Sequence, residues 1–325
     1  MPLGEFELID RYFRAAGALR ADVVLGVGDD GALLRPPAEH DLVAVSDTLV
    51  EGVHFPKNSP PQSIGHRALA VNLSDIAAMG ATPAWALLSL TLPNNDEPWI
   101  AAFARGFSAL AVQHEVALVG GDTTRGPLTI GVQVLGVVPR GKGLRRAGAQ
   151  VGDRVFVSGT PGDAAAGLEV VRGALVPGKE NTPRGAAARE ELRARFEYPT
   201  PRLALGRLLL ELASACIDVS DGLAGDLAKL ATASGCGARI DLARLRPSAA
   251  LAAAADPAQA RQWMLSGGDD YELLFTISPQ NVSKFEALRI EGVQEIGVLV
   301  PGAGVELCEA GRRIGMADAG FDHFG

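Results

Sequence analysis

The sequence lacks the features of several large protein classes. Its three cysteines, Cys216, Cys236 and Cys308, are widely spaced and form no CxxC pair, so neither a disulfide framework nor a zinc site is indicated. Its five histidines show no HExxH or comparable spacing of zinc ligands. No apolar run approaches the ~18 residues of a membrane-spanning helix. These absences argue against a disulfide-rich scaffold, a zinc enzyme and a transmembrane protein.

A surplus of basic residues is also missing. Asp and Glu number 38 against 30 Lys and Arg, which gives a formal net charge of −8, whereas nucleic acids and anionic membranes attract a basic surface. The opening residues MPLGEFELIDRYF contain neither the basic region nor the apolar segment of a signal peptide. We therefore expect a cytoplasmic protein that binds neither nucleic acid nor membranes.

The common phosphate-binding motifs are absent too, and glycine–aspartate turns stand in their place. There is no GxxxxGK(S/T) loop, no HRD loop and no GxGxxG after a strand. Instead, the apolar run in VVLGVGDDGALL ends in two glycines followed by Asp29 and Asp30. Similar apolar runs lead to Asp47 in VAVSDT, Asp122 in LVGGDTT, and Asp218 and Asp221 in CIDVSDG, while Asp75 of NLSDIAAMG falls in a predicted helix.

Two interpretations of these aspartates are open. An aspartate after Gly or Ser at the end of a strand is ordinary turn chemistry, because its side chain bonds the backbone two residues on. However, these aspartates lie between apolar segments with little lysine nearby, and buried carboxylates are costly unless cations compensate them. A ligand set made only of oxygens favours Mg²⁺, which commonly bridges carboxylates to substrate phosphates. The pattern therefore favours a phosphoryl-transfer site.

Periodicity predicts a two-domain protein of the α+β (mixed α/β) class. The first domain, residues 1–140, should contain buried strands before Asp29 and over 41–50, 84–92, 116–119 and 129–138, with helices over 63–79 and 99–114. The strand at 129–138 is apolar on both faces, so it is either central or covered by another subunit. The second domain, residues 150–325, should contain strands at 154–158, 216–219 and 238–242, helices at 163–172, 203–213 and 223–234, and an exposed charged stretch at 179–189.

Eight motifs in order carry a family resemblance. GEFELIDRYF, GVGDDGALL, SDTLVEGVHF, NLSDIAAMGATP, GGDTTRG, DVSDGLAGDL, SGGDDYEL and GFDHF span essentially the whole chain. Together they resemble the thiamine-monophosphate kinases, a family in the superfamily that also holds aminoimidazole ribonucleotide synthetase and selenophosphate synthetase.

The resemblance implies a two-domain aminoimidazole ribonucleotide synthetase-like fold and a homodimer. The N-terminal domains would pair their sheets across the dimer and bind ATP and Mg²⁺, and the C-terminal α/β domain would complete the active site. The implied reaction is direct in-line transfer of the γ-phosphoryl group of ATP to thiamine monophosphate, which gives thiamine diphosphate.

The resemblance also assigns site residues, with no residue acting as a general base and with Asp30, Asp122 and Asp218 the most critical. The implied ligands of several Mg²⁺ ions are Asp30, Val45 through its carbonyl, Ser46, Asp47, Asp75, Asp122, Asp218 and Asp221. The implied ATP contacts are Gly121, Asp122, Arg146 and Ser220, and the implied contacts to thiamine monophosphate are His54, Asp269 and Phe321.

Structural alternatives stand beside some of these roles. The family pattern Gly-Gly-Glu-Asp is Gly267-Gly268-Asp269-Asp270 here, so Asp269 is one methylene shorter and either reaches substrate through a water or is a turn residue. Arg146 has the alternative of a surface arginine, His54 of a structural histidine, and Phe321 of an anchor for the tail.

Two rival functions come from other classes. The first is another ATP-dependent synthetase of the superfamily, but selenophosphate synthesis needs a reactive cysteine near the N-terminus, and the first cysteine is Cys216. The second is a non-catalytic nucleotide- or metal-binding relative. Degenerate relatives normally lose ligands, whereas every acidic turn of this sequence keeps its aspartate.

Overall fold

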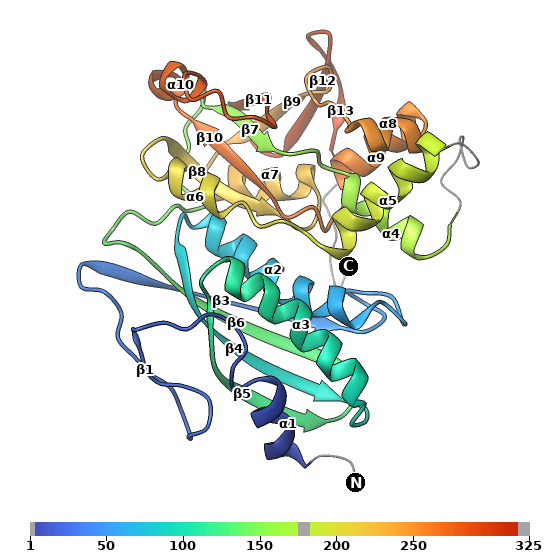
Figure 1. Cartoon of the computed structure of the whole chain (residues 1–325). Helices are drawn as coiled ribbons and strands as arrows, with labels where there is room; N and C mark the ends of the chain where they lie inside the picture. The colour runs from blue at the N-terminus through green and yellow to red at the C-terminus, as the bar shows by residue number, and fades with distance from the viewer. Residues whose placement is uncertain (1–3, 175–182, 318–325) are drawn as a thin grey trace. The chain divides into compact units, whose positions relative to one another are not determined.

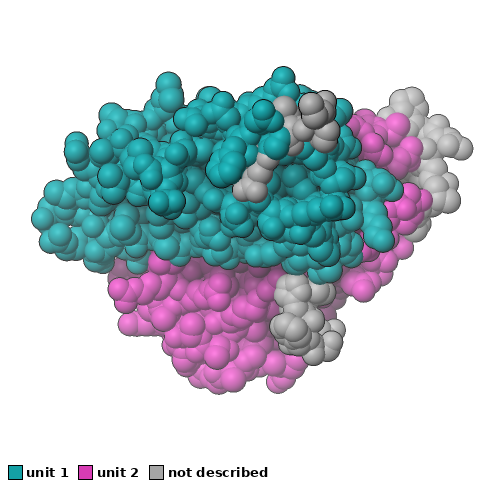
Figure 2. Space-filling view, turned by 90° about the horizontal axis from the view of Figure 1, so that it is seen from below, with its two compact units in different colours: residues 1–76, 81–143 teal, residues 77–80, 144–325 magenta. Residues whose placement is uncertain are grey.

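The computed structural model describes residues 4–174 and 183–317 and divides into two compact units. Unit 1 comprises residues up to 76 together with 81–143, and unit 2 comprises 77–80 together with the chain from 144 onward (Figures 1 and 2). The sequence had placed the change of domain between residues 140 and 150. Among the described residues, no helix is both long and apolar enough to cross a membrane.

Unit 1 is built on a four-stranded sheet with the order β3-β6-β4-β5. Its strands are β3 (His40–Val50), β4 (Thr82–Leu92), β5 (Ala117–Arg125) and β6 (Thr129–Pro139). β6 pairs antiparallel with both β3 and β4, so the first of the two alternatives for this apolar strand, a central position, is confirmed. Its even-numbered residues Ile130, Val132 and Val134 are buried, while its odd-numbered residues are half-buried.

Two helices, α2 (Pro61–Ala78) and α3 (Glu97–Gln113), cover one face of this sheet (Figure 1). They meet through glycines: a Cβ added at Gly65 would overlap the carbonyl oxygen of Phe103, and one added at Gly106 would overlap that of Gln62. The helix backbones therefore touch directly. This contact explains the small residues along the buried side of α2.

The strand predicted before Asp29 and Asp30 exists but is not buried. A short hairpin of β1 (Val23–Leu25) and β2 (Leu33–Leu34) carries the two aspartates, and Val24 is 55% exposed. A helix, α1 (Glu5–Tyr12), precedes it. The hairpin has only one short ladder of its own, so it does not enter the sheet that forms the core of unit 1.

One other strand runs further than the apolar pattern indicated. Asp122 lies inside β5 and not after it, whereas Asp47 lies inside β3, which matches the strand expected over 41–50. β5 pairs with β4 as far as Arg125. Backbone hydrogen bonding to a neighbouring strand, which side-chain periodicity does not report, extends β5.

Unit 2 contains a seven-stranded mixed sheet with the order β13-β12-β9-β11-β7-β10-β8. The strands are β7 (Arg154–Ser158), β8 (Ala213–Val219), β9 (Gly237–Asp241), β10 (Glu272–Ile277), β11 (Val293–Val300), β12 (Val305–Glu309) and β13 (Arg312–Met316). The helices are α4 (Asp163–Val171), α5 (Pro183–Glu197), α6 (Leu203–Leu209), α7 (Leu223–Ala233), α8 (Ala249–Ala254), α9 (Pro257–Ser266) and α10 (Pro279–Glu286).

One prediction for this unit is wrong and another is met only in part. The stretch at 179–189, expected to be charged and exposed, is described from residue 183 onward, where α5 begins; Ala186 and Ala187 are exposed there, but Ala188 is buried. The helix expected over 203–213 ends at Leu209, because Ala213 already pairs with β10 as the first residue of β8. In both places tertiary contacts outweigh the local signal of charge or periodicity.

A fully buried carboxylate ties three elements of unit 2 together. Glu272 on β10 accepts hydrogen bonds from Arg195 of α5 at 2.6 Å, from Arg202 before α6 at 2.6 Å, and from the hydroxyl of Ser158 on β7. Burial alone would raise the pKa of Glu272, but the hydrogen bonds and charges of the two arginines outweigh it, so the pKa lies below its usual value.

We expect Glu272→Gln to destabilise the protein by about 3 kcal/mol or more at pH 7, because it leaves two largely buried arginines without their counter-charge. Since the folded pKa is depressed, the charge of Glu272 contributes its full stability above the unfolded pKa of about 4.3 and loses it as the pH falls further. Urea unfolding from pH 7 to pH 3 should therefore show a difference that shrinks below about pH 4.3. The exposed Glu286→Gln is the matched control, and an equal loss in both variants would contradict the prediction.

Candidate active site

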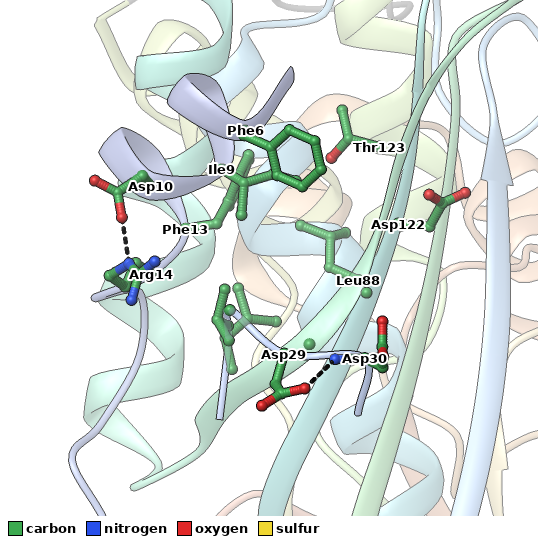
Figure 3. Close-up of a pocket in the computed structure, with 15 residues that line it drawn as sticks. Phe6, Ile9, Asp10, Phe13, Arg14, Asp29, Asp30, Leu88, Asp122 and Thr123 are labelled. Carbon is green, nitrogen blue, oxygen red and sulfur yellow. Dashed lines mark hydrogen bonds and ion pairs between the residues drawn. The ribbon is translucent and has the colours of Figure 1, made fainter. Parts of the chain in front are cut away.

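The hairpin aspartates of unit 1 open onto a cavity of about 470 Å³ (Figure 3). Phe6, Ile9 and Phe13 of α1 line one side of it, and residues 120–123 of β5 line another. Figure 3 shows the side chains of Asp29, Asp30 and Asp122 at this cavity. The structure therefore brings together acidic residues that lie more than ninety positions apart in the sequence.

Within the hairpin the two adjacent aspartates differ in role. The carboxylate of Asp29 accepts the backbone N–H of Asp30 at 2.8 Å, a local contact to the next residue and not the contact two residues on that the turn interpretation describes. The Asp30 carboxylate has no such backbone partner among the described residues. Asp30 is therefore the better candidate for a ligand, as the sequence had suggested.

Bare backbone forms part of the cavity wall. Gly121 has a φ of 151°, and a Cβ there would overlap the carbonyl oxygen of Leu88 on the neighbouring strand. No other residue fits at this point of β5 without moving β4. The glycine therefore permits the close approach of β5 to β4 beside Asp122.

The charge of the cavity is strongly negative. Asp10, Asp29, Asp30 and Asp122 line it. Arg14 is the one basic residue of the lining among the residues that the structure describes, and it is already paired with Asp10. An anionic ligand would need added cations to enter. The motif reading did not assign Asp10 and Arg14, although their spacing of four residues in an amphipathic helix was visible in the sequence.

A second acidic pair lies between β3 and α2. Asp47 is hydrogen-bonded to Asp75, and burial raises the pKa of Asp47 while the bond to Asp75 opposes that rise. The backbone N–H of Asp47 donates to the side chain of Asn72 at 3.1 Å, and Asn72 in turn donates to the carbonyl of Ala68. Two carboxylates in contact require a shared proton or a cation, so this pair fits a hard divalent ion.

The predicted site residues of unit 2 lie on two loops in contact. Asp218 is buried at the end of β8, with Ser220 and Asp221 directly after it. The backbone N–H of Asp269 donates to the carbonyl of Ser220 at 2.9 Å, which joins the DVSDG and SGGDDYEL motifs. A Cβ at Gly268 would lie 2.6 Å from that same carbonyl oxygen, so the glycine permits the contact.

Asp226 and Lys229 of α7, which the motif reading did not assign, hold the first of these loops. The buried carboxylate of Asp226 accepts the N–H groups of Ser220 and Asp221 at 3.0 Å each. Lys229 donates to Asp226 at 2.8 Å and also pairs with Asp221. Burial raises the pKa of Asp226, while Lys229 and the loop amides oppose the rise. In the sequence, the spacing of three residues between Asp226 and Lys229 on a predicted helix could have indicated that the two side chains form an ion pair.

The two aspartates of SGGDDYEL have separate roles. Asp270 is buried and accepts the N–H groups of Gly162 at 2.7 Å and Ala164 at 3.1 Å, so it caps the start of α4. Asp269 and Tyr271 both have positive φ angles of 71° and 51°, and the Tyr271 hydroxyl donates to the Asp269 carboxylate at 3.1 Å. This backbone strain sits at the predicted substrate contact.

The remaining predicted site residues do not share hydrogen bonds with one another. His54 accepts the backbone N–H of Val50 at its Nδ1 atom over 3.0 Å, which is a structural contact. The side chain of Arg146 is exposed and its carbonyl accepts the Ser234 hydroxyl. Val45 and Ser46 precede Asp47 on β3. Phe321 lies outside the described residues.

The predicted ligands therefore form three groups, one at the hairpin cavity, one at Asp47 and Asp75, and one on the loops of unit 2. Across residues 4–174 and 183–317, no three acidic, histidine or cysteine side chains converge as a ready metal cluster. The individual metal, nucleotide and substrate assignments stay predictions. The donor atoms of the predicted metal ligands are all oxygens, which suits Mg²⁺.

Comparison with known proteins covers nearly the whole chain. Residues 28–138 match the AIR synthase related protein N-terminal domain, and residues 150–308 match the C-terminal domain of the same proteins. The thiamine-monophosphate kinase of Salmonella typhimurium is 48% identical over 86% of this chain and 85% of its own length.

Two solved structures extend the comparison. The thiamine-monophosphate kinase of Stenotrophomonas maltophilia is 46% identical with a TM-score of 0.83, covering 97% of this chain and 99% of its own. AaThiL complexed with AMPPCP and TMP is 33% identical with a TM-score of 0.76, covering 99% and 97%. The chain therefore belongs to the AIR synthase related protein family and, within it, to the thiamine-monophosphate kinases.

Proposed function

We propose that this chain transfers the γ-phosphoryl group of ATP to thiamine monophosphate and releases thiamine diphosphate and ADP. The observation that carries the proposal is the match along almost the full chain to AaThiL, whose complex holds AMPPCP and TMP. The acidic cavity beside Gly121 and Asp122 suits a nucleotide that arrives with cations. The hydrogenase maturation protein HypE of E. coli, at 20% identity and a TM-score of 0.72, shows the shared fold alone.

The proposed roles of the chain's residues are to position two polyanions. Gly121, Asp122, Ser220 and Arg146 would contact ATP. Asp269, held by Tyr271, and His54 would contact thiamine monophosphate. Because the acceptor is a phosphate monoester with a second pKa near ~6, its attacking oxygen is mostly ionised at pH 7 and no general base is needed.

We propose that Mg²⁺ is the companion ion. Asp30, Asp47, Asp75, Asp122, Asp218 and Asp221 would hold several ions, with Ser46 and the Val45 carbonyl beside them. Bound Mg²⁺ would neutralise the phosphate charges that otherwise keep the two substrates apart. The contact between Asp47 and Asp75, in which burial raises the pKa of Asp47, supports this assignment.

We also propose a homodimer formed through the sheet face of unit 1 that α2 and α3 leave uncovered. Leu42 of β3, which is 55% exposed, stands opposite Val137 of β6 on that face, with Ala44 opposite Leu135 next to it. An apolar sheet face of this kind usually packs against another layer. For the compartment, all three cysteines are free and buried, which suits the reducing cytoplasm.

The function is tested by product analysis. The purified chain with ATP and thiamine monophosphate should form thiamine diphosphate in equal amount to ADP, as measured by mass spectrometry. Removal of divalent ions with EDTA should abolish the product, and Mg²⁺ should restore it. Free thiamine and aminoimidazole-pathway substrates serve as controls, and turnover of one of those in place of thiamine monophosphate would refute the proposal.

The metal assignment is tested by Asp47→Asn. The amide keeps the shape of the side chain but removes the charge that binds the ion, so we expect kcat to fall by at least about 100-fold, the size of a lost electrostatic contact in an active site. Asp41→Asn makes the same change on the same strand and should retain activity. A normal rate and a normal Mg²⁺ requirement in Asp47→Asn would remove Asp47 from the ligand set.

The dimer is tested by Leu42→Arg. A buried charge at an apolar interface without a partner costs several kcal/mol, so the wild type should sediment as a dimer and the variant as a monomer in analytical ultracentrifugation. Leu208→Arg, at an exposed position of α6, is the control. A dimer that survives Leu42→Arg unchanged would place the interface elsewhere.

A further inference from the structure

A cavity of about 380 Å³ lies on the sheet of unit 2, over β7, β9, β11 and β12. One of its lining residues, Arg239, stands on β9 between the core residues Ala238 and Ile240, so the cavity faces away from the core. Its volume is in the range of small-molecule pockets, roughly 300–1,000 Å³. Among the described residues that line it, none is assigned above to ATP, Mg²⁺ or thiamine monophosphate.

A β-bulge shapes the floor of the cavity. On β11, Ile296 and Leu299 are both buried in the core although they are three positions apart, because the pairing with β7 shifts register at this point. Gly297 lies in the bulge, and a Cβ added there would overlap the carbonyl oxygen of Arg239 on β9. The floor is therefore bare backbone beside Val298, and a hollow is left in the sheet face.

Three arginines form the walls of the cavity. Arg154 of β7 and Arg239 of β9 both pair with Val298, so their side chains stand on the same face of the sheet, one on each side of it. Arg244 follows β9, and its side chain pairs with the same carboxylate as Arg154, that of Glu295. The three arginine side chains are between 37% and 48% exposed, so a ligand from solution can reach them.

Positive charge exceeds negative charge around the cavity. Among the described residues, four arginines share three carboxylates. The ion pairs are those of Arg154 and Arg244 with Glu295, of Arg244 with Asp241, and of Arg239 and Arg313 with Glu306. One positive charge is left over, in a chain whose formal net charge is −8. Each guanidinium group also carries more N–H donors than these pairs use.

We infer that this cavity binds a small multivalent oxyanion, a molecule that presents phosphate or carboxylate groups to Arg154, Arg239 and Arg244. The planar guanidinium group matches both of these groups with paired N–H donors. Glu295 holds two of the arginines in place and competes with the ligand for their donors. The inference does not depend on the proposed function, because the cavity shares no lining residue with the proposed kinase site.

The test is calorimetry on the full-length chain, with inorganic phosphate and citrate as the two probes. The buffer has low ionic strength and is freed of divalent ions on a chelating resin, so that no metal links a probe to the acidic residues of the chain. The wild type should bind at least one probe at a single site with a Kd at or below about 1 mM. Tighter binding of phosphate would assign the site to a phosphorylated molecule, and tighter binding of citrate to a polycarboxylate.

Two variants should change this Kd in opposite directions. Arg244→Gln removes a charged donor, so binding should weaken about tenfold, the effect of one hydrogen bond to a charged group. Glu295→Gln removes the competing carboxylate and should tighten binding about tenfold. Arg172→Gln, which removes an arginine that pairs with Glu169 outside the cavity, is the control and should leave the Kd unchanged. Melting temperatures check that each variant is folded.

The outcomes separate this site from the proposed kinase activity. A wild type that binds neither probe, or a Kd that is the same in wild type, Arg244→Gln and Glu295→Gln, would overturn the oxyanion site. Turnover of thiamine monophosphate does not enter the measurement. A chain without kinase activity that shows the two opposite shifts would therefore keep this site, and an active kinase that shows neither shift would lose it.

Discussion

Repulsion between carboxylates is the constraint on which the rest of this structure depends. Acidic side chains from distant parts of the chain are brought to the same places: the hairpin and β5 at one cavity, β3 and α2 at another point of unit 1. Such groups are stable together only when a cation or a proton is added. The fold therefore places an electrostatic cost at these positions, which the proposed binding of Mg²⁺ would relieve.

Unit 2 shows how the chain compensates acids that have a purely structural role. Glu272 is matched by two arginines, Asp270 by the amides at the start of α4, and Asp226 by two loop amides and Lys229. Each of these buried carboxylates has its donors inside the protein. Asp30 and Asp122 have no comparable set among the described residues. This difference in compensation separates structural acids from ligand candidates better than sequence position does.

The sequence predicted the fold class, the central strand β6 and the helices of unit 1, because their apolar periodicity is strong. It missed α5, in which buried residues such as Leu192 alternate with charged ones. It also missed the exposure of β1, which depends on where the sheet ends. It named acidic residues of the site through motifs. The residues that hold them, Asn72 and Asp226 through backbone N–H groups and Tyr271 through its hydroxyl, make hydrogen bonds that the motifs alone do not indicate.

The backbone contact between α2 and α3 bears on how this chain can evolve. Gly65 and Gly106 each occupy a space that any side chain would fill with atoms of the opposite helix. A substitution at either position would separate the helices, and α2 carries Asp75 near one end and Ile64 near the other. Substitution at these two glycines is therefore strongly restricted by the packing of the helices, which are free to diverge only on their outer surfaces.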